Sequence, residues 1–194
     1  MSLREPLVTS RLSLTPLVPS DLDELFALFS DPGTWLHLPA ARHTNPNESS
    51  AIIREAMTSR THCGFGQWAV RLGEDAHIPG LAAGQFVGIG GLTLANVGVW
   101  NLGYRFVPAS WGHGLAGEVA RASMICAAVV NSTLPVTARI LSNNPASSAV
   151  ARRVGLEKVW TGRTVTPAAA GVTGEIYSNR AVTTEQLEWL KVRT

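Results

Sequence analysis

The sequence has few charged residues, few cysteines and no long apolar run. Among 194 residues, charged side chains make up 15% and hydrophobic ones 45%, and the net charge is +2. Lys and Arg form no basic run, so a broad nucleic-acid-binding face is not expected. The hydrophobic content is too high for a disordered chain and fits a single globular domain spanning residues 1–194.

Two absences concern metals and membranes. Cys63 and Cys126 have neither metal-site spacing nor a suitably placed histidine, so we expect two buried thiols and no bound metal. No segment approaches the roughly 18 consecutive apolar residues of a membrane span, and residues 1–6 lack the apolar stretch of a signal peptide. These absences favour a cytoplasmic protein with no membrane partner, either a monomer or a homodimer.

The hydrophobic pattern predicts a mixed α/β sheet with helices on both faces. Strands are expected at residues 11–17, 65–71, 85–94, 99–107, 136–141, 156–163 and 173–177. Helices are expected after Ser20, from an N-cap at Asn47, from Leu115, from Asn144 and over Thr184–Lys191. In the strand at 99–107, the even-numbered residues Trp100 to Phe106 share one face, and the odd-numbered Asn101 to Arg105 share the other.

The segment at residues 106–118 joins a strand to a helix through a turn rich in small residues. The N–H groups at a helix start lack partners and lie at the positive end of the helix dipole, so a phosphate suits this place. Glycines allow a pyrophosphate to approach the main chain closely. The alternative is a tight turn that simply requires glycine. Glu118, in the first helical turn, is expected to complement the dipole or to pack.

Residues 112–117 also match the dinucleotide-binding pattern G-x-G-x-x-G. Three features disfavour that interpretation. Residues 108–111 separate the pattern from its strand, several strands precede it, and no acid ends the next strand to hold a ribose. An NAD(P)-binding oxidoreductase therefore stays a remote alternative.

A second strand-to-helix segment follows at residues 142–156. Because parallel strands place their helix starts at one edge of a sheet, both segments are expected to face one crevice. Taken singly, Asn144 is explained as an N-cap, with Pro145 at the first helical position and Gly155 just past the end. Ser147 alone is explained as a surface residue.

Together the two segments resemble the GNAT superfamily of N-acetyltransferases, in particular the RimJ/RimL-type branch, which acetylates protein N-termini, including those of ribosomal proteins. The family loop R/Q-x-x-G-x-G/A is matched by residues 111–116 as W-G-x-G-x-A, with Trp111 at the first position. The branch element N-x-x-S…G-F/L is matched by residues 144–147 and 155–156. The opening at residues 9–14 and the order of elements match as well.

The resemblance implies a GNAT acyl-CoA N-acyltransferase fold and acetyl-CoA as co-substrate without a metal. The sheet would be mostly antiparallel, with six or seven strands, and would splay between strands 99–107 and 136–141. Pantetheine would pair with the main chain at Phe106 and Val107, the pyrophosphate would bind the amides of residues 112–117, and Asn144 and Ser147 would lie near the pantetheine and the sulfur. The implied cofactor-binding residues are Phe106, Val107, Trp111, Gly112, His113, Gly114, Leu115, Ala116, Gly117, Asn144 and Ser147.

The implied reaction is direct attack of a neutral amine on the thioester in a ternary complex. Ser147 is the candidate to protonate the departing thiolate, and Glu175 is the candidate base or amine ligand, although most such carboxylates are simply solvated. Trp35, Tyr104 and Glu175 are the candidate acceptor-binding residues, although a Trp is also typical of a core. His37 and His43 lie in the same early loop region as Trp35. The acceptor pocket would lie between the first two helices and the last strands, with residues 72–84 and 164–174 as its variable walls.

The acceptor itself carries no readable motif. A primary amine is preferred, with a protein or peptide N-terminus as the first candidate. A small metabolite or aminoglycoside-like amine, a donor acyl group longer than acetyl, and a GNAT-fold sensor that binds acyl-CoA without catalysis remain alternatives.

Overall fold

The backbone forms one sheet with helices on both faces. The computed structural model describes residues 6–165 and 169–192. Within these residues the sheet has eight strands in the order β1-β2-β3-β4-β5-β6-β8-β7. The strands are β1 (Leu7–Val8), β2 (Leu12–Pro16), β3 (Trp68–Leu72), β4 (Phe86–Ala95), β5 (Val99–Phe106), β6 (Val136–Leu141), β7 (Glu157–Arg163) and β8 (Thr173–Ser178).

The predicted class, a mostly antiparallel mixed sheet, is confirmed, because only β5 and β6 pair in parallel. The described sheet has one strand more than the predicted six or seven. The strand that the sequence analysis missed is β1, whose two residues are too few to show a period of two.

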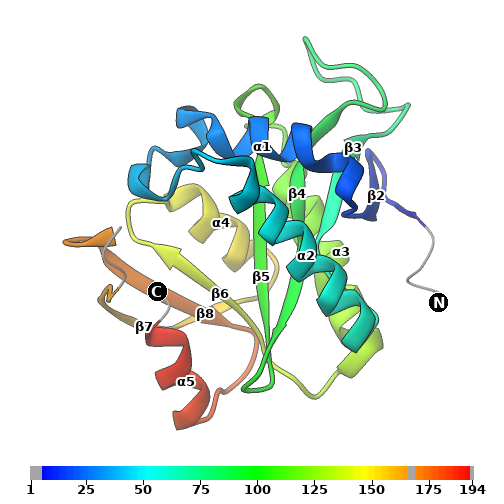
Figure 1. Ribbon diagram of the computed structural model, residues 1–194. Helices are drawn as coiled ribbons and strands as arrows, with labels where there is room; N and C mark the ends of the chain where they lie inside the picture. Colours follow the sequence, from blue (N-terminus) through cyan, green and yellow to red (C-terminus); the bar gives the residue numbers. More distant parts are fainter. Residues whose placement is uncertain (1–5, 166–168, 193–194) are drawn as a thin grey trace.

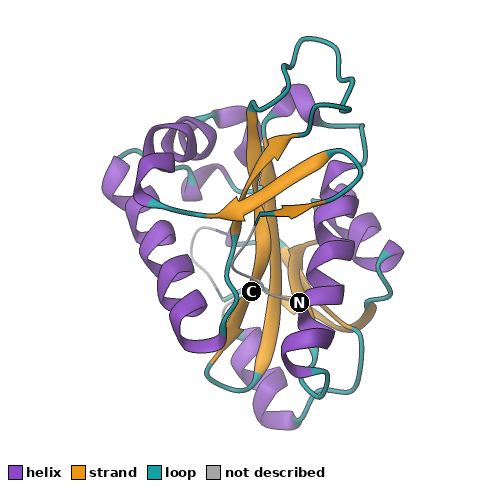
Figure 2. Ribbon diagram, turned by 90° about the vertical axis from the view of Figure 1, so that its right-hand side faces the viewer, coloured by secondary structure: helices purple, strands orange, loops and turns teal. Residues whose placement is uncertain are grey.

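Helices cover both faces of the sheet (Figures 1 and 2). They are α1 (Leu22–Ser30), α2 (Pro46–Cys63), α3 (Leu115–Asn131), α4 (Pro145–Arg153) and α5 (Thr184–Lys191). Helices α1 and α2 share a buried cluster with Ala69 and Ile89, whereas α3 and α4 share one with Val70 and Val87. The successive residues Ala69 and Val70 in β3, and Phe86 and Val87 in β4, thus serve opposite layers. None of the described helices is long and apolar enough to span a bilayer.

Strand β5 separates from β6 after a short contact. The two strands pair only at Trp100 with Val136 and at Asn101 with Thr137. On its other side β5 pairs with β4 along its whole length, so β5 itself stays extended. The predicted splay between these two strands is therefore confirmed, and the rest of this edge of β5 is left without a neighbouring strand.

The start of α2 differs from the sequence prediction by two residues. Asn45, rather than Asn47, is the N-cap, and its Oδ1 accepts the N–H of Asn47 at 2.9 Å. Glu48 returns a carboxylate oxygen to the N–H of Asn45 at 2.9 Å. This reciprocal capping box satisfies two N–H groups at once, and Pro46 occupies the first helical position, where its missing N–H is not needed.

A buried carboxylate ties the N-terminal strands to α3. Glu118 Oε1 accepts hydrogen bonds from the hydroxyls of Thr9 (2.6 Å) and Ser10 (3.0 Å) and from the N–H of Arg11 (2.9 Å). Glu118 Oε2 accepts from Arg11 Nε at 2.9 Å and pairs with Nη2 at 2.8 Å. Glu118 is only 6% exposed, so it packs, as expected, and it also fixes the first turn of α3 against the start of β2.

Glu118→Gln should lower the free energy of unfolding at pH 7 by about 2 kcal/mol. The amide removes the charge from a buried ion pair and turns a second donor toward Arg11. Urea unfolding followed by tryptophan fluorescence measures the difference between the wild-type protein and the variant.

This difference should depend on pH. Burial alone raises the pKa of Glu118, but the hydrogen bonds from Thr9, Arg11 and Ser10 outweigh it and lower the pKa overall. The contribution is therefore fully present above the unfolded carboxyl pKa of about 4.3 and is lost as the pH falls through the lowered folded value. A difference between the two proteins that stays constant from pH 7 into this acid range would contradict the assignment.

Candidate functional site

The start of α3 presents a row of unpartnered amides. Gly112 and Gly114 have positive φ angles of 82° and 77°, which glycine adopts without strain. The first α3 amide bonded to a carbonyl is that of Glu118, which donates to Gly114 at 3.2 Å. None of the N–H groups at 112–117 donates to a described residue, and they lie at the positive end of the helix dipole. This arrangement suits a phosphate.

Two guanidinium groups lie beside this turn. Arg11 Nη1 donates to the carbonyl of His113 at 2.8 Å. Arg121, one turn into α3, places its Nη1 3.6 Å from the position that a Cβ on Gly117 would occupy. The sequence analysis missed Arg121, although its position four residues after Gly117 puts both on one helix face.

Trp111, the residue at the first position of the loop pattern, bonds to the end of β5. Its side chain is 49% exposed, and its indole N–H donates to the carbonyl of Phe106 at 2.9 Å. The main chain of Val107 is used internally, because its N–H donates to Val87 and its carbonyl accepts from Ser110. Of the two predicted pantetheine partners, only Phe106 thus turns its main chain toward the gap.

The open edge of β5 carries further main-chain groups. In an antiparallel pair, alternate residues direct both main-chain groups to the same neighbour. Since Val107 bonds to β4 and the pairing with β6 ends at Asn101 and Thr137, the main-chain groups of Tyr104 and Phe106 face the gap beside β6. An extended ligand can pair there as a strand does.

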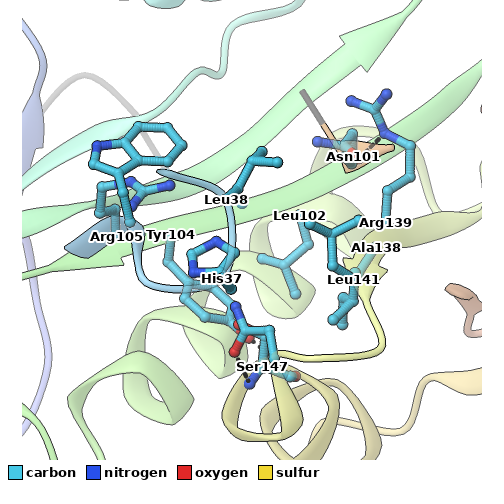
Figure 3. Close-up of a pocket in the computed structure, with 15 residues that line it drawn as sticks. His37, Leu38, Asn101, Leu102, Tyr104, Arg105, Ala138, Arg139, Leu141 and Ser147 are labelled. Atoms are coloured by element: carbon cyan, nitrogen blue, oxygen red, sulfur yellow. Dashed lines mark hydrogen bonds between the residues drawn. The ribbon is translucent and has the colours of Figure 1, made fainter. Parts of the chain in front are cut away.

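A cavity of about 310 Å³ opens at this gap (Figure 3). Its walls come from the loop after α1, from β5 and β6, and from the start of α4. The lining residues are Trp35, His37, Leu38, Asn101, Leu102, Gly103, Tyr104, Arg105, Ala138, Arg139, Ile140, Leu141, Asn144, Ser147 and Ala169. The predicted residues Trp35, Tyr104, Asn144 and Ser147 are therefore brought together.

The α4 end of the cavity holds three polar side chains. Asn144 is the N-cap of α4, and its Oδ1 accepts the N–H of Ser147 at 3.1 Å, as predicted. The hydroxyl of Tyr104 donates to the carbonyl of Ser147 at 3.2 Å. Burial raises the pKa of Tyr104 to about 12, so this group is a neutral donor. The hydroxyl of Ser147 bonds to none of the described residues.

The opposite wall combines rings with a guanidinium. Trp35 is buried and donates its indole N–H to the carbonyl of Phe29 at 2.6 Å, so it belongs to the core while lining the cavity. Arg105 lies 3.4 Å from the centre of the Trp35 ring. Burial and the nearby Arg105 charge hold the pKa of His37 below its usual value. Asn143 fastens this loop to α4 by donating to the carbonyl of His37 at 3.0 Å.

Comparison with known proteins agrees with this geometry. The family model described as Acetyltransferase (GNAT) domain matches residues 11–157. The chain belongs to the GNAT acetyltransferase family. The predicted resemblance is thus confirmed at the level of the family.

Solved GNAT structures share the fold at low sequence identity. An acetyltransferase from Agrobacterium tumefaciens is 22% identical with a TM-score of 0.69, over 91% of this chain and 95% of its own. The Salmonella typhimurium enzyme that modifies the N-terminal serine of ribosomal protein L7/L12 is 16% identical (TM-score 0.70; 91% and 98%). The microcin C7 self-immunity acetyltransferase MccE, in complex with acetyl-CoA and AMP, is 14% identical (TM-score 0.68; 93% and 99%).

Glu175 lies outside the cavity of this GNAT domain. Its carboxylate accepts from Lys158 Nζ at 2.9 Å, from the Tyr177 hydroxyl at 2.7 Å and from the Ser148 hydroxyl at 3.3 Å. Burial raises its pKa, but the bonds from Tyr177, Lys158 and Ser148 lower it more. A carboxylate with a lowered pKa is a weak base, and the structure does not bring it together with Tyr104 and Ser147.

The two predicted variable walls differ in position. The loop at 72–84 projects from the sheet beyond β3 and forms a separate shallow depression between Glu74 and Ala83. None of its residues lines the cavity. In the other segment, Ala169 lines the cavity, whereas residues 166–168 lie outside the described residues.

Among the described residues, no group of three His, Cys, Asp or Glu side chains is placed to hold a metal ion.

The tyrosine at the cavity should titrate unusually. We expect the absorbance of wild-type protein at 295 nm to show a tyrosinate step near pH 12 that disappears in Tyr104→Phe, because burial opposes ionisation. The free energy of unfolding should therefore fall as the pH rises from about 10, where an exposed tyrosine ionises, toward 12. A step near pH 10 that is lost in the Phe variant would show that Tyr104 is solvated.

Proposed function

We propose that this chain transfers an acetyl group from acetyl-CoA to a primary amine, with a protein or peptide N-terminus as the first candidate acceptor. The observation that carries the proposal is a continuous set of unused donors. The free amides at 112–117 follow the open edge of β5 after the short turn at residues 107–111, and that edge leads into the cavity with Tyr104 and Ser147. A long ligand with a phosphate group, amide groups and a reacting group would place them, in that order, at the α3 amides, at the edge of β5 and in the cavity.

The residues present fit acetyl-CoA. The amides at 112–117 would hold the pyrophosphate, with Arg121 beside them as a cation. The main chain of Tyr104 and Phe106 would pair with the pantetheine amides. The capping bond that Asn144 Oδ1 accepts fixes the orientation of this side chain, and its N–H₂ group would donate to the pantetheine. When bound, acetyl-CoA supplies the acetyl group as an activated thioester. The complex of MccE with acetyl-CoA supports this assignment by analogy of fold.

The cavity side chains supply proton chemistry. The Ser147 hydroxyl has no partner among the described residues, so its proton would be available to the departing sulfur. The Tyr104 hydroxyl is neutral at pH 7, and its proton is donated to the carbonyl of Ser147, so it helps to fix the start of α4 beside the cavity. His37 is neutral at pH 7 and lines the cavity, and although its pKa is lowered, an imidazole remains a stronger base than a carboxylate whose pKa is also lowered. This assignment moves the role of base from Glu175 to a residue that lines the cavity.

The proposal has two alternatives. One is a different acceptor, and the other is a protein that binds acetyl-CoA without catalysis. The Salmonella enzyme that acts on a ribosomal protein N-terminus supports a peptide acceptor, whereas the fold of MccE, a self-immunity enzyme, keeps a small-molecule acceptor in view. A sensor that binds acetyl-CoA without turnover would use the same α3 amides. Release of CoA that depends on an added amine separates an enzyme from a sensor.

Acetyl-CoA and CoA should each raise the melting temperature by several degrees, whereas NAD and NADP should not. A ligand at about 100 times its dissociation constant stabilises by roughly 2.7 kcal/mol, and each kcal/mol shifts a domain of this size by about 2–4 °C. Differential scanning fluorimetry provides the measurement. A shift with NAD or NADP alone would return residues 112–117 to the dinucleotide pattern.

Two variants at one glycine localise that effect. Gly114→Glu should abolish the acetyl-CoA shift, because it places a carboxylate among the phosphate-binding amides. Gly114→Ala is the matched control, since it carries the same strain at a φ of 77° without the charge and should keep most of the shift. Equal shifts in both variants would place the cofactor elsewhere.

Neighbouring serines test the proton donor. Ser147→Ala should lower kcat by about a hundredfold, the low end of what positioned proton transfer contributes. Ser148→Ala is the control, because that hydroxyl bonds to Glu175 and does not line the cavity, and its kcat should stay within about threefold. Steady-state release of CoA with an amine acceptor gives both values. Similar losses in the two variants would assign Ser147 a structural role only.

A further inference from the structure

The described lining of the cavity contains basic side chains and no acidic ones. Two guanidinium groups line it, Arg105 and Arg139, and no Asp or Glu is among its described lining residues. In Figure 3, Arg105 and His37 lie on one side of the cavity and Arg139 with Asn101 on the other. Arg139 Nε donates to Asn101 Oδ1 at 3.4 Å. The acceptor would therefore enter a positively charged space.

Arg105 is a half-buried cation without a carboxylate partner in the part of the chain that the structure describes. It stacks on Trp35, lies 5.1 Å from the centre of the Phe29 ring, and donates through Nη1 to the carbonyl of Thr34. A guanidinium has five N–H donors, so most of them are not used by these contacts. Elsewhere in the molecule, Arg11 and Arg71 are paired with carboxylates. Arg105 has no such partner among the described residues, and it lines the cavity.

A purely structural role does not account for this placement. Burial without an anion lowers the pKa of Arg105 to about 10, so the group remains charged at neutral pH. Burying an unpaired charge is unfavourable, and stacking on rings offsets only part of that cost. A neutral donor could bond to the carbonyl of Thr34 without the free-energy cost of desolvating a charge. The retained charge has a use if the ligand supplies the counter-ion.

We propose that the amine acceptor carries a carboxylate and that Arg105 binds it. The proposal rests on the acetyltransferase function and names its substrate class. A planar guanidinium recognises a carboxylate with two parallel hydrogen bonds, and the Trp35 ring holds it flat for that contact. Tyr104 and Arg105 both line this one cavity, so an amine near Tyr104 and a carboxylate on Arg105 belong to one small molecule or to one short N-terminal peptide.

Matched acceptors test the proposal. The peptides are Ser-Glu-Ala-Ala, Ser-Gln-Ala-Ala and Ser-Lys-Ala-Ala, all as C-terminal amides, and the small amines are γ-aminobutyrate and its amide. We expect wild-type kcat/KM to favour the carboxylate member of at least one set by about tenfold or more, the factor that one charge-assisted hydrogen bond contributes. The set that shows this preference identifies the source of the carboxylate.

The preference should depend on Arg105. In Arg105→Gln the ratio of acid to amide should fall close to one, and in Arg105→Lys it should be partly retained, since Lys keeps the charge without the fork. Arg152→Gln is the matched control, because this guanidinium contacts Tyr177 and does not line the cavity. Each ratio is taken within one variant, so a partial loss of folded protein does not affect it.

The outcomes separate this proposal from the function on which it rests. Turnover that is equal for acids and amides, or an acid preference that Arg105→Gln leaves intact, overturns the carboxylate assignment and leaves the acetyltransferase. If no amine is acetylated, thermal shifts of CoA-saturated protein decide. A shift with the Glu peptide but not the Gln peptide, lost in Arg105→Gln, supports the carboxylate site while the proposed reaction fails. Equal shifts overturn the site.

Discussion

The divergence of β5 from β6 is the constraint on which the site depends. Continued pairing would bond the main chain of Tyr104 to β6 and would fill the space between the strands. An open edge leaves polar groups that need partners, because an unsatisfied buried amide or carbonyl is costly. The chain supplies one partner itself, the Trp111 indole on the carbonyl of Phe106. The others face the cavity, where a ligand can complete the sheet.

The second requirement is an α3 start that is rigid and yet free to bind an anion. A carboxylate in the first turn of a helix ordinarily compensates the positive end of the dipole. Glu118 occupies that turn, but its two oxygens accept from residues 9–11 and its charge is balanced by Arg11. The amides at 112–117 are left without an internal acceptor. One ion pair thus fixes the turn and keeps it electropositive.

The sequence was sufficient for most of the elements and for the two strand-to-helix segments that line the gap. Asn144, Ser147 and residues 112–117 stand at fixed offsets within two strand-to-helix units, so local chemistry places them. Glu175 could not be placed in this way. Its neighbours Lys158 and Ser148 are brought to it by β7 and α4, and whether its carboxylate is engaged or free depends on that packing. The N-cap of α2 was misplaced because two asparagines flank Pro46 and only the backbone selects Asn45.

The sequence predicts on which face of β5 Arg105 lies, but it does not predict whether Arg105 has a counter-ion. Alternation along β5 puts Arg105 on the face opposite Phe106, but it does not show whether a carboxylate from another element packs beside it. The packing supplies an aromatic ring at 3.4 Å in place of a counter-ion. A stacked guanidinium has already lost most of its rotamer freedom, so binding an anion costs it little further entropy. The same rigidity that keeps an unpaired charge in place therefore prepares it for recognition.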